Sequence, residues 1–259
     1  MTPEVWPLAA ALLGGAVIAF LLSVFGGGGS VLATPLLLYV VGIRDPHVAI
    51  GTSAAAVAVN ALGGLLSQAR AGRVKWPCAL TFGAAGLSGA LVGAHLARQV
   101  DGGRLLLWFS VAMTAVALSM LLPRKGEGDP GVHLTPAMTL RLAPLGLGTG
   151  LAAGFFGIGG GFLIAPGLMA ATGMTLANAA ASSLVSVVLF GAATSASYAY
   201  AGLIDWPVVI ALVAGGAFGT LAGVPASRLL AGHAVLARRL FAGMVLATAA
   251  YVAWRSLAA

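Results

Sequence analysis

Residues 25–35 read FGGGGSVLATP, and residues 156–166 read FGIGGGFLIAP, 131 positions later. A second motif returns at a spacing of 130, because AGRVKWP at 71–77 is followed by AGLIDWP at 201–207. Two copies of a hydrophobic unit, each interrupted by a glycine cluster, are the sequence pattern of a transporter built from repeats. The duplication therefore predicts an architecture and also a class of function.

The composition excludes an ordinary soluble domain. Sixty per cent of the 259 residues are apolar and 7% are charged, whereas soluble domains carry about 25% charged residues. Several apolar stretches have the roughly 20 residues that cross a bilayer core, so we expect an all-α polytopic membrane protein. The ten stretches are residues 5–25, 31–43, 47–68, 76–97, 105–122, 141–156, 161–173, 175–200, 206–230 and 238–258.

Other function classes find little support in the sequence. The net charge of +7 does not predict a nucleic-acid partner, because the basic residues stand singly or in short groups at the ends of apolar stretches. The single cysteine, Cys78, excludes an intrachain disulfide and a cysteine-only metal site. We expect no cofactor and no metal. We also do not expect an enzyme, because the histidines are scattered and no acidic residue accompanies them in the sequence as a catalytic partner. The scattered histidines are His47, His95, His133 and His233.

The second apolar stretch of each half is short. Residues 31–43 and 161–173 number 13 each, and 13 helical residues rise only about 20 Å, against a core of about 30 Å. The first stretch of the second half, 141–156, is also short. The first two stretches of each half could therefore make one broken crossing, two crossings, or a re-entrant hairpin that makes none.

Loop charges distinguish an even from an odd number of crossings. If the first two stretches of each half cross the membrane an even number of times, nine basic residues lie on one side and four on the other. If they cross it once, six basic residues lie on one side and seven on the other. Only the even number gives a positive-inside bias. The nine are Arg70, Arg73, Lys75, Arg124, Lys125, Arg141, Arg228, Arg238 and Arg239, and the four are Arg44, Arg98, Arg104 and Arg255.

With an even number of crossings by the first two stretches, each half crosses the membrane three or five times in total, which is an odd number. We therefore predict two inverted repeats, each with a Gly-rich broken or re-entrant helix pair plus three spanning helices. The repeats are 1–122 and 141–259, joined by a cytoplasmic linker at 123–140. Both termini then face away from the cytoplasm.

The glycine clusters are the first candidate site. Four consecutive glycines would each cost about 1 kcal/mol in an α-helix relative to alanine, and a break inside a membrane must be buried in protein or line a wet cavity. A helix that begins beyond the break points its free N–H groups and positive dipole end at the glycines, which favours an anion. The alternative is that these glycines only permit close helix packing. The candidates are Gly28, Gly29, Ser30 and Thr34, then Gly159, Gly160 and Gly161.

Paired hydroxyls are the second candidate. Thr52-Ser53 aligns with Ser182-Ser183 at the spacing of 130. Hydroxyls can donate to anion oxygens without carrying charge, so the ligand can leave again, but they can equally bond back to their own helix. None of the six acidic residues lies well inside an apolar stretch, which argues against coupling through a membrane carboxylate. Export of an anion could then run on the membrane potential alone.

These motifs resemble the sulfite exporter TauE/SafE family of membrane permeases. The resemblance rests on GGGGSVLATP and GIGGGFLIAP, on the GTS segment at 51–53 and on the duplicated AGxxxWP element, and it extends from about residue 8 to 250. It implies transport of sulfite, sulfoacetate or related organosulfonates across the bacterial inner membrane. Together with the loop charges, this location makes both termini periplasmic, and the membrane potential favours export. Carried over to matching positions, the family's site falls on Gly28–Ser30, Gly159–Gly161 and the two hydroxyl pairs.

The resemblance leaves several points open. The second copy has Ser-Ser where the first has Thr-Ser, so it departs from the family's wording at the first position of the pair. The partners it implies are a small sulfur anion and the lipid bilayer, with a homodimer left open. A permease for a different small solute or a metal ion remains the alternative.

Overall fold

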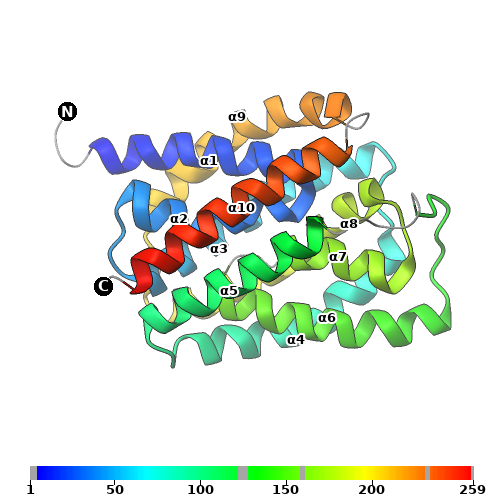
Figure 1. Ribbon diagram of the computed structural model, residues 1–259, viewed down its shortest axis with the longest axis horizontal. Helices are drawn as coiled ribbons and strands as arrows, with labels where there is room; N and C mark the ends of the chain where they lie inside the picture. Colours follow the sequence, from blue (N-terminus) through cyan, green and yellow to red (C-terminus); the bar gives the residue numbers. More distant parts are fainter. Residues whose placement is uncertain (1–4, 122–127, 158–160, 231–233, 258–259) are drawn as a thin grey trace.

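The computed structural model describes residues 5–121, 128–157, 161–230 and 234–257, and these form a helical bundle (Figure 1). Within them, six helices are long and apolar enough to cross a membrane, and the all-helical prediction is confirmed. The first half contains α1 (Val5–Phe25), the 3₁₀ segment η1 (Gly26–Leu32), α2 (Ala33–Leu36), the π-helical η2 (Leu37–Val41), α3 (Pro46–Arg70), α4 (Trp76–Ala97) and α5 (Gly102–Leu121). The second contains α6 (Pro136–Phe156), α7 (Gly161–Thr172), α8 (Leu176–Tyr200), α9 (Trp206–Leu230) and α10 (Ala234–Leu257).

Local sequence signals set several helix ends. Asp45 caps α3 by accepting a hydrogen bond from the His47 N–H at 2.8 Å, and Pro46 occupies the first turn, where no N–H partner is needed. Thr135 caps α6, which begins five residues before the end of the expected 123–140 linker and reaches 21 residues. Gly42 (φ 91°) and Gly173 (φ 72°) follow η2 and α7 in the left-handed conformation that glycine adopts most easily.

Stripes of glycine join helices of opposite halves. α6 packs along α4 and α9 packs along α1, so closely that a Cβ atom added to these glycines would overlap the facing backbone. Small residues at such interfaces let helices in membranes approach each other. The packing alternative therefore holds for these glycines. Along α6 and α4 the pairs are Gly146 with Phe82, Gly150 with Gly86 and Gly154 with Ala90; along α9 and α1 they are Gly215 with Leu12 and Gly219 with Ala16.

The order of these contacts gives the helix directions. Both glycine-packed pairs are parallel, because residue numbers rise together on the two helices. α3 is also parallel to α9, since Thr52 contacts Asp205 and Asn60 contacts Leu212 further along. α1 and α3 therefore run in the same direction, and residues 26–45 return the chain to the end where α1 begins. This return is what an even number of crossings requires.

The corresponding helices α3 and α8 are antiparallel. Gly51 of α3 lies beside Tyr198, near the end of α8, whereas Gly64 lies beside Leu184, near its beginning. An inverted relation between the halves requires this arrangement, so the contact supports the inversion, which itself stays a prediction. The beginning of α1 and the end of α10 lie at one end of the bundle (Figure 1, left). We call this the terminal end and the opposite one the linker end.

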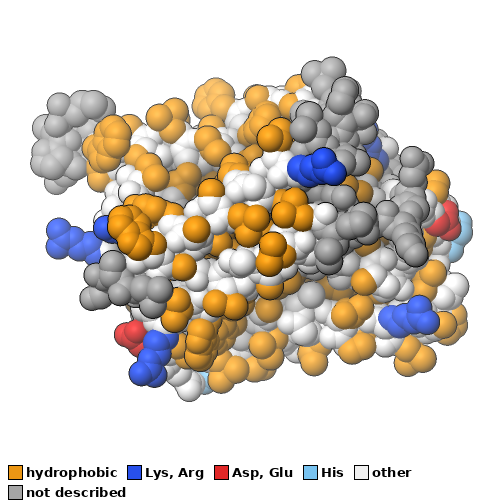
Figure 2. Space-filling model, viewed as in Figure 1, with side chains coloured by type: hydrophobic (Ala, Val, Ile, Leu, Met, Phe, Trp, Pro, Cys, Tyr) orange, Lys and Arg blue, Asp and Glu red, His pale blue; other side chains and the backbone are white. Residues whose placement is uncertain are grey.

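Loops sort between these ends as the charge count assumed. Loops 42–45, 98–101 and 201–205 lie at the terminal end, and loops 71–75 and 173–175 at the linker end. In Figure 2, hydrophobic side chains cover the middle of the visible face, and most charged side chains lie towards its left and right. The basic residues at the linker end whose side chains the structure describes are Arg70, Arg73, Lys75, Arg141 and Arg239.

Three hydrophobic clusters hold the bundle together. The largest draws on most helices, the second joins α5 and α10 to the glycine-rich regions, and the third lies around Ile50 and Tyr198. In the second cluster, Phe25 of the first half stacks on Phe241 of the second at 4.5 Å, and Phe156 of the second packs against Phe109 of the first at 5.8 Å between ring centroids. Each glycine-rich region is therefore anchored on the last helix of the other half.

Candidate functional site

The second half has the helix break that its glycines predicted. α6 ends at Phe156, and Gly157 caps it with φ 66°. A Cβ atom at Gly157 would overlap a methyl group of Ile50, so both the backbone angle and the space favour glycine there. α7 then begins at Gly161, which is buried. Gly159 and Gly160 lie outside the described residues.

The first half differs from the expectation. The four glycines do not break the helical path; residues 26–32 continue from α1 as a 3₁₀ helix, and α2 begins at Ala33. A 3₁₀ helix is tighter than an α-helix and is common at helix ends. Gly29 packs against the backbone of Leu21 and Leu22, where a side chain would not fit, and Gly28 lies against the Phe241 ring. These glycines therefore allow the chain to fold back closely on α1.

Ser53 connects the two irregular regions. Its hydroxyl lies 2.9 Å from the Thr34 hydroxyl, in α2 of the first half. The same hydroxyl can donate to the Ile50 carbonyl at 3.0 Å and to the Gly157 carbonyl at 3.4 Å, at the break of the second half. Thr34 and Ser53 are at most 1% exposed. The structure thus brings Thr34, Ser53 and Gly157 together in the protein interior, where two halves meet.

Ser183 and Ser30 are also completely buried. Ser183, the counterpart of Ser53, donates to the Ala180 carbonyl at 2.8 Å on its own helix. Ser30 belongs to η1, which contacts both α7 and α8. α7 and α8, the helices that contain Gly161, Ser182 and Ser183, therefore contact the first-copy segment that contains the glycines.

Thr52 and Ser182 hold helix starts of the opposite halves. Thr52 Oγ1 accepts a hydrogen bond from the Asp205 N–H at 2.9 Å, immediately before α9. Ser182 Oγ accepts one from the Lys75 N–H, also at 2.9 Å, immediately before α4. Each hydroxyl therefore binds the AGxxxWP element of the other half. This reciprocal contact gives the first member of each pair a structural task that sequence reasoning missed.

Loss of this contact should destabilise the protein without removing a large side chain. Thr52→Val leaves the part-buried Asp205 N–H without its acceptor, which costs about 1–3 kcal/mol where the group is shielded from water. We expect a melting temperature lower by several degrees in detergent, at roughly 2–4 °C per kcal/mol. Thr52→Ser keeps the hydroxyl and should melt close to the wild type. An unchanged melting temperature for Thr52→Val would show that the hydrogen bond contributes nothing.

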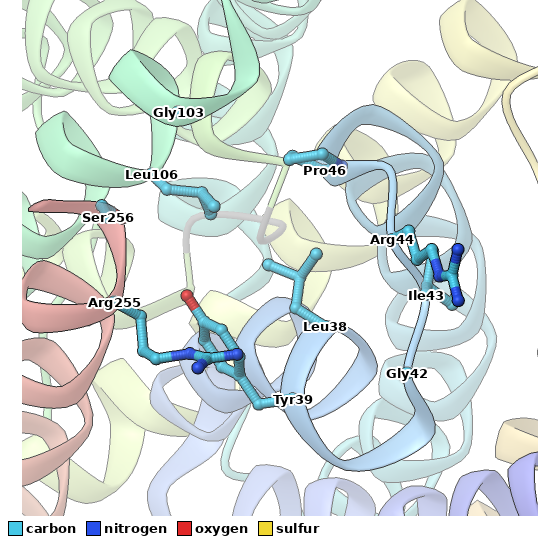
Figure 3. Close-up of a pocket in the computed structure, with 10 residues that line it drawn as sticks. All are labelled: Leu38, Tyr39, Gly42, Ile43, Arg44, Pro46, Gly103, Leu106, Arg255 and Ser256. Atoms are coloured by element: carbon cyan, nitrogen blue, oxygen red, sulfur yellow. The ribbon is translucent and has the colours of Figure 1, made fainter. Parts of the chain in front are cut away.

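A cavity of about 470 Å³ at the terminal end was also missed by sequence reasoning. Tyr39 and Arg44 contribute to it from the first half, and Arg255 and Ser256 contribute from the end of α10 (Figure 3). The two arginines belonged to the smaller basic group of the charge count. Their distance in sequence gave no signal that they line one cavity.

Comparison with known proteins identifies the relatives of this chain. The "Sulfite exporter TauE/SafE" family matches residues 11–252. A protein of Xylella fastidiosa named "Probable membrane transporter protein" is 44% identical over 245 residues, which cover 94% of both chains. The "Probable membrane transporter protein YunE" of Bacillus subtilis is 26% identical over 227 residues, covering 80% of this chain and 83% of YunE.

A search of the solved structures gave no match. The family match spans nearly the whole chain and agrees with the apolar helices of the bundle. Its relatives are named as membrane transporters, so the protein is a multi-pass membrane transporter rather than an enzyme. The chain belongs to the sulfite exporter TauE/SafE family.

Proposed function

We propose that the protein exports small sulfur-containing anions, such as sulfite, sulfoacetate or related organosulfonates, across the bacterial inner membrane. The observation that carries the proposal is the Ser53 hydroxyl, buried between Thr34 of one half and the Gly157 carbonyl of the other. The site comprises this cluster, the glycine-rich segments around it and Ser183. The family description, which refers to sulfite, supports the substrate class.

The buried polar groups suit an anion better than a cation. In the described part of the chain, the buried polar side chains are hydroxyls and the amide of Asn60, without a carboxylate. A cation would be expected to need carboxylate or histidine ligands in the interior. Hydroxyl donors can turn from a backbone carbonyl towards an anion oxygen and back again. The anion would then bind weakly enough to be released.

The orientation follows from the charges at the two ends. Positive charge gathers on the cytoplasmic side of membrane proteins, so we place the linker end in the cytoplasm and both termini in the periplasm. The two halves then form inverted repeats, in line with the antiparallel contact of α3 and α8. The irregular segments lie between the two ends, where a transport site accessible from each side in turn is needed.

Transport by the purified protein in liposomes tests the proposal. We expect sulfite or sulfoacetate to redistribute with the membrane potential, without a sodium or proton gradient. An anion that moves alone should reach an accumulation ratio of about tenfold for every ~60 mV if it carries one charge, since 100 mV corresponds to about 2.3 kcal/mol per charge. Sulfoacetate carries two charges at neutral pH, so its ratio should be about tenfold for every ~30 mV. Empty liposomes and a neutral amino acid are the controls. Flux that requires a cation gradient would contradict uniport, and flux of other solutes alone would contradict the substrate class.

A further inference from the structure

The cavity at the terminal end lies outside the Ser53 cluster and combines the end of one half with the end of the other. Figure 3 shows the Arg255 side chain over the Tyr39 ring on one side and Arg44 on the other, with Leu38 between them. The volume of about 470 Å³ can hold a small organic ion. The lining residues are Leu38, Tyr39, Gly42, Ile43, Arg44, Pro46, Gly103, Leu106, Arg255 and Ser256.

The charges around this cavity are unbalanced. Its described lining contains two arginines and no aspartate or glutamate. The neighbouring acids are already engaged at helix starts. Asp45 accepts from the His47 N–H at 2.8 Å, and Asp101 accepts from the N–H groups of Gly103 and Arg104 at 3.0 and 3.2 Å. Both carboxylates keep their negative charge but do not line the cavity, so the two guanidinium groups lie nearer to a ligand inside it than these acids do, which favours an anion.

Hydrogen-bond donors accompany the positive charge. The Ser256 hydroxyl is buried and has no partner in the described part of the chain. The Tyr39 ring is held from two sides, by Tyr251 at 5.0 Å between centroids and by the Arg255 guanidinium at 5.7 Å from the ring centroid. In Figure 3 the Tyr39 hydroxyl points towards Leu106 rather than towards Arg44. Ser256 lines the cavity, so its hydroxyl is a further donor near an oxygen-bearing ligand.

The equivalent place in the second half is covered. Gly173 corresponds to Gly42 at the spacing of 131, and both have a positive φ. At Gly173 the chain before α6 packs against the loop, because the Asp129 N–H donates to the Gly173 carbonyl at 2.9 Å. Asn178 donates to the Pro130 carbonyl at 3.3 Å, and Val132 is buried in the main core. Residues 129–132 of the linker thus cover this place at the linker end, whereas the corresponding place at the terminal end is open and forms the cavity.

We propose that this cavity is a second anion site, an outer vestibule for small organic anions that bear a sulfonate or carboxylate group. Arg255, Tyr39 and Ser256 hold the acid group, and Arg44 adds positive potential at the mouth. Leu38 and Leu106 face the short apolar part of the ligand. Binding at this site does not depend on the proposed transport; only its use as the exit for the exported anion rests on that function.

Cysteine labelling measures the potential of the cavity. Gly103 lines it, and Gly131, near the linker end, is a matched control, because each N–H donates to an aspartate two residues before it. Each cysteine is placed singly in a Cys78→Ala background. The purified protein is treated with 2-sulfonatoethyl methanethiosulfonate, an anion, or its trimethylammonioethyl analogue, a cation. The ratio of the two rates cancels differences in thiol reactivity.

We expect the anion-to-cation rate ratio to be about tenfold higher at Gly103→Cys than at Gly131→Cys, and to fall with salt. Arg255→Gln and Arg44→Gln should each lower the ratio at position 103 severalfold, whereas Arg239→Gln, elsewhere on α10, should leave it unchanged. Sulfoacetate should slow labelling at position 103 only. Tyr39→Phe should weaken this protection, and Arg255→Lys should keep the rate ratio but weaken protection, because lysine lacks the planar fork of donors.

Equal rate ratios at the two positions, or labelling at position 103 that sulfoacetate does not slow, would overturn the vestibule. Thermal melting of each variant establishes that it is folded before its rates are compared. The result is separate from the transport test. Protection in a protein that moves no sulfur anion refutes the proposed function alone, and transport without protection refutes the vestibule alone.

Discussion

Gly150→Leu should prevent the folded protein from accumulating. Gly150 contacts the backbone of Gly86, where an added Cβ atom would overlap the carbonyl group. The obstacle is main chain, so a change of side-chain rotamer cannot relieve it, and α6 has to move away from α4. Overpacking costs about 1–3 kcal/mol where side chains can adjust, and we expect more here. A variant that does fold should melt roughly 10 °C lower, at about 2–4 °C per kcal/mol.

Gly148→Leu is the matched control on the same helix. A Cβ atom at Gly148 has no neighbour within 4 Å, and the residue is exposed. The two variants add the same side chain two positions apart and give the same gain in intrinsic helix propensity. Size-exclusion profiles and melting curves in detergent should therefore separate them clearly. Similar behaviour of both variants would contradict the close packing of α4 and α6.

The sequence predicted those parts of the fold that depend on local signals. Apolar length predicted most helices to within a few residues, and the expected stretch 206–230 is α9. Matched spacing identified the two halves, and loop charges predicted the return of the chain between α1 and α3. These signals are local because the thickness of the bilayer fixes the length of a spanning helix and each loop lies on one side of the membrane.

The remaining features depend on contacts between the halves. The alignment of Thr52-Ser53 with Ser182-Ser183 could be seen in the sequence. The sequence did not show that Thr52 and Ser182 each bind the AGxxxWP element of the opposite half. The 3₁₀ path of Gly26–Leu32 was also hidden, because it depends on how the glycines pack against α1 and Phe241. Arg44 and Arg255 come together only once the whole bundle has formed. Repeated motifs in this chain thus mark places where one half contacts the other.

Loss of the Ser53 and Ser183 hydroxyls should have the largest effect on transport. Ser53→Ala removes the group that joins Thr34 to the break at Gly157, and Ser183→Ala removes its counterpart. A hydrogen bond to a charged group contributes about 1.5–3 kcal/mol, and 1.4 kcal/mol is a factor of ten. We expect each single variant to reduce initial sulfoacetate flux in liposomes about tenfold, and the double variant to reduce it further.

A matched control separates binding from packing. Ser186 is as completely buried on α8 as Ser183, but its hydroxyl has no hydrogen-bond partner in the described residues and lies near Gly83 of α4. Ser186→Ala should therefore keep full flux. Ser53→Thr keeps a hydroxyl and should retain more flux than Ser53→Ala if the hydroxyl itself acts on the anion. Full flux in the double alanine variant would remove these hydroxyls from the site and leave the glycine segments as its candidates.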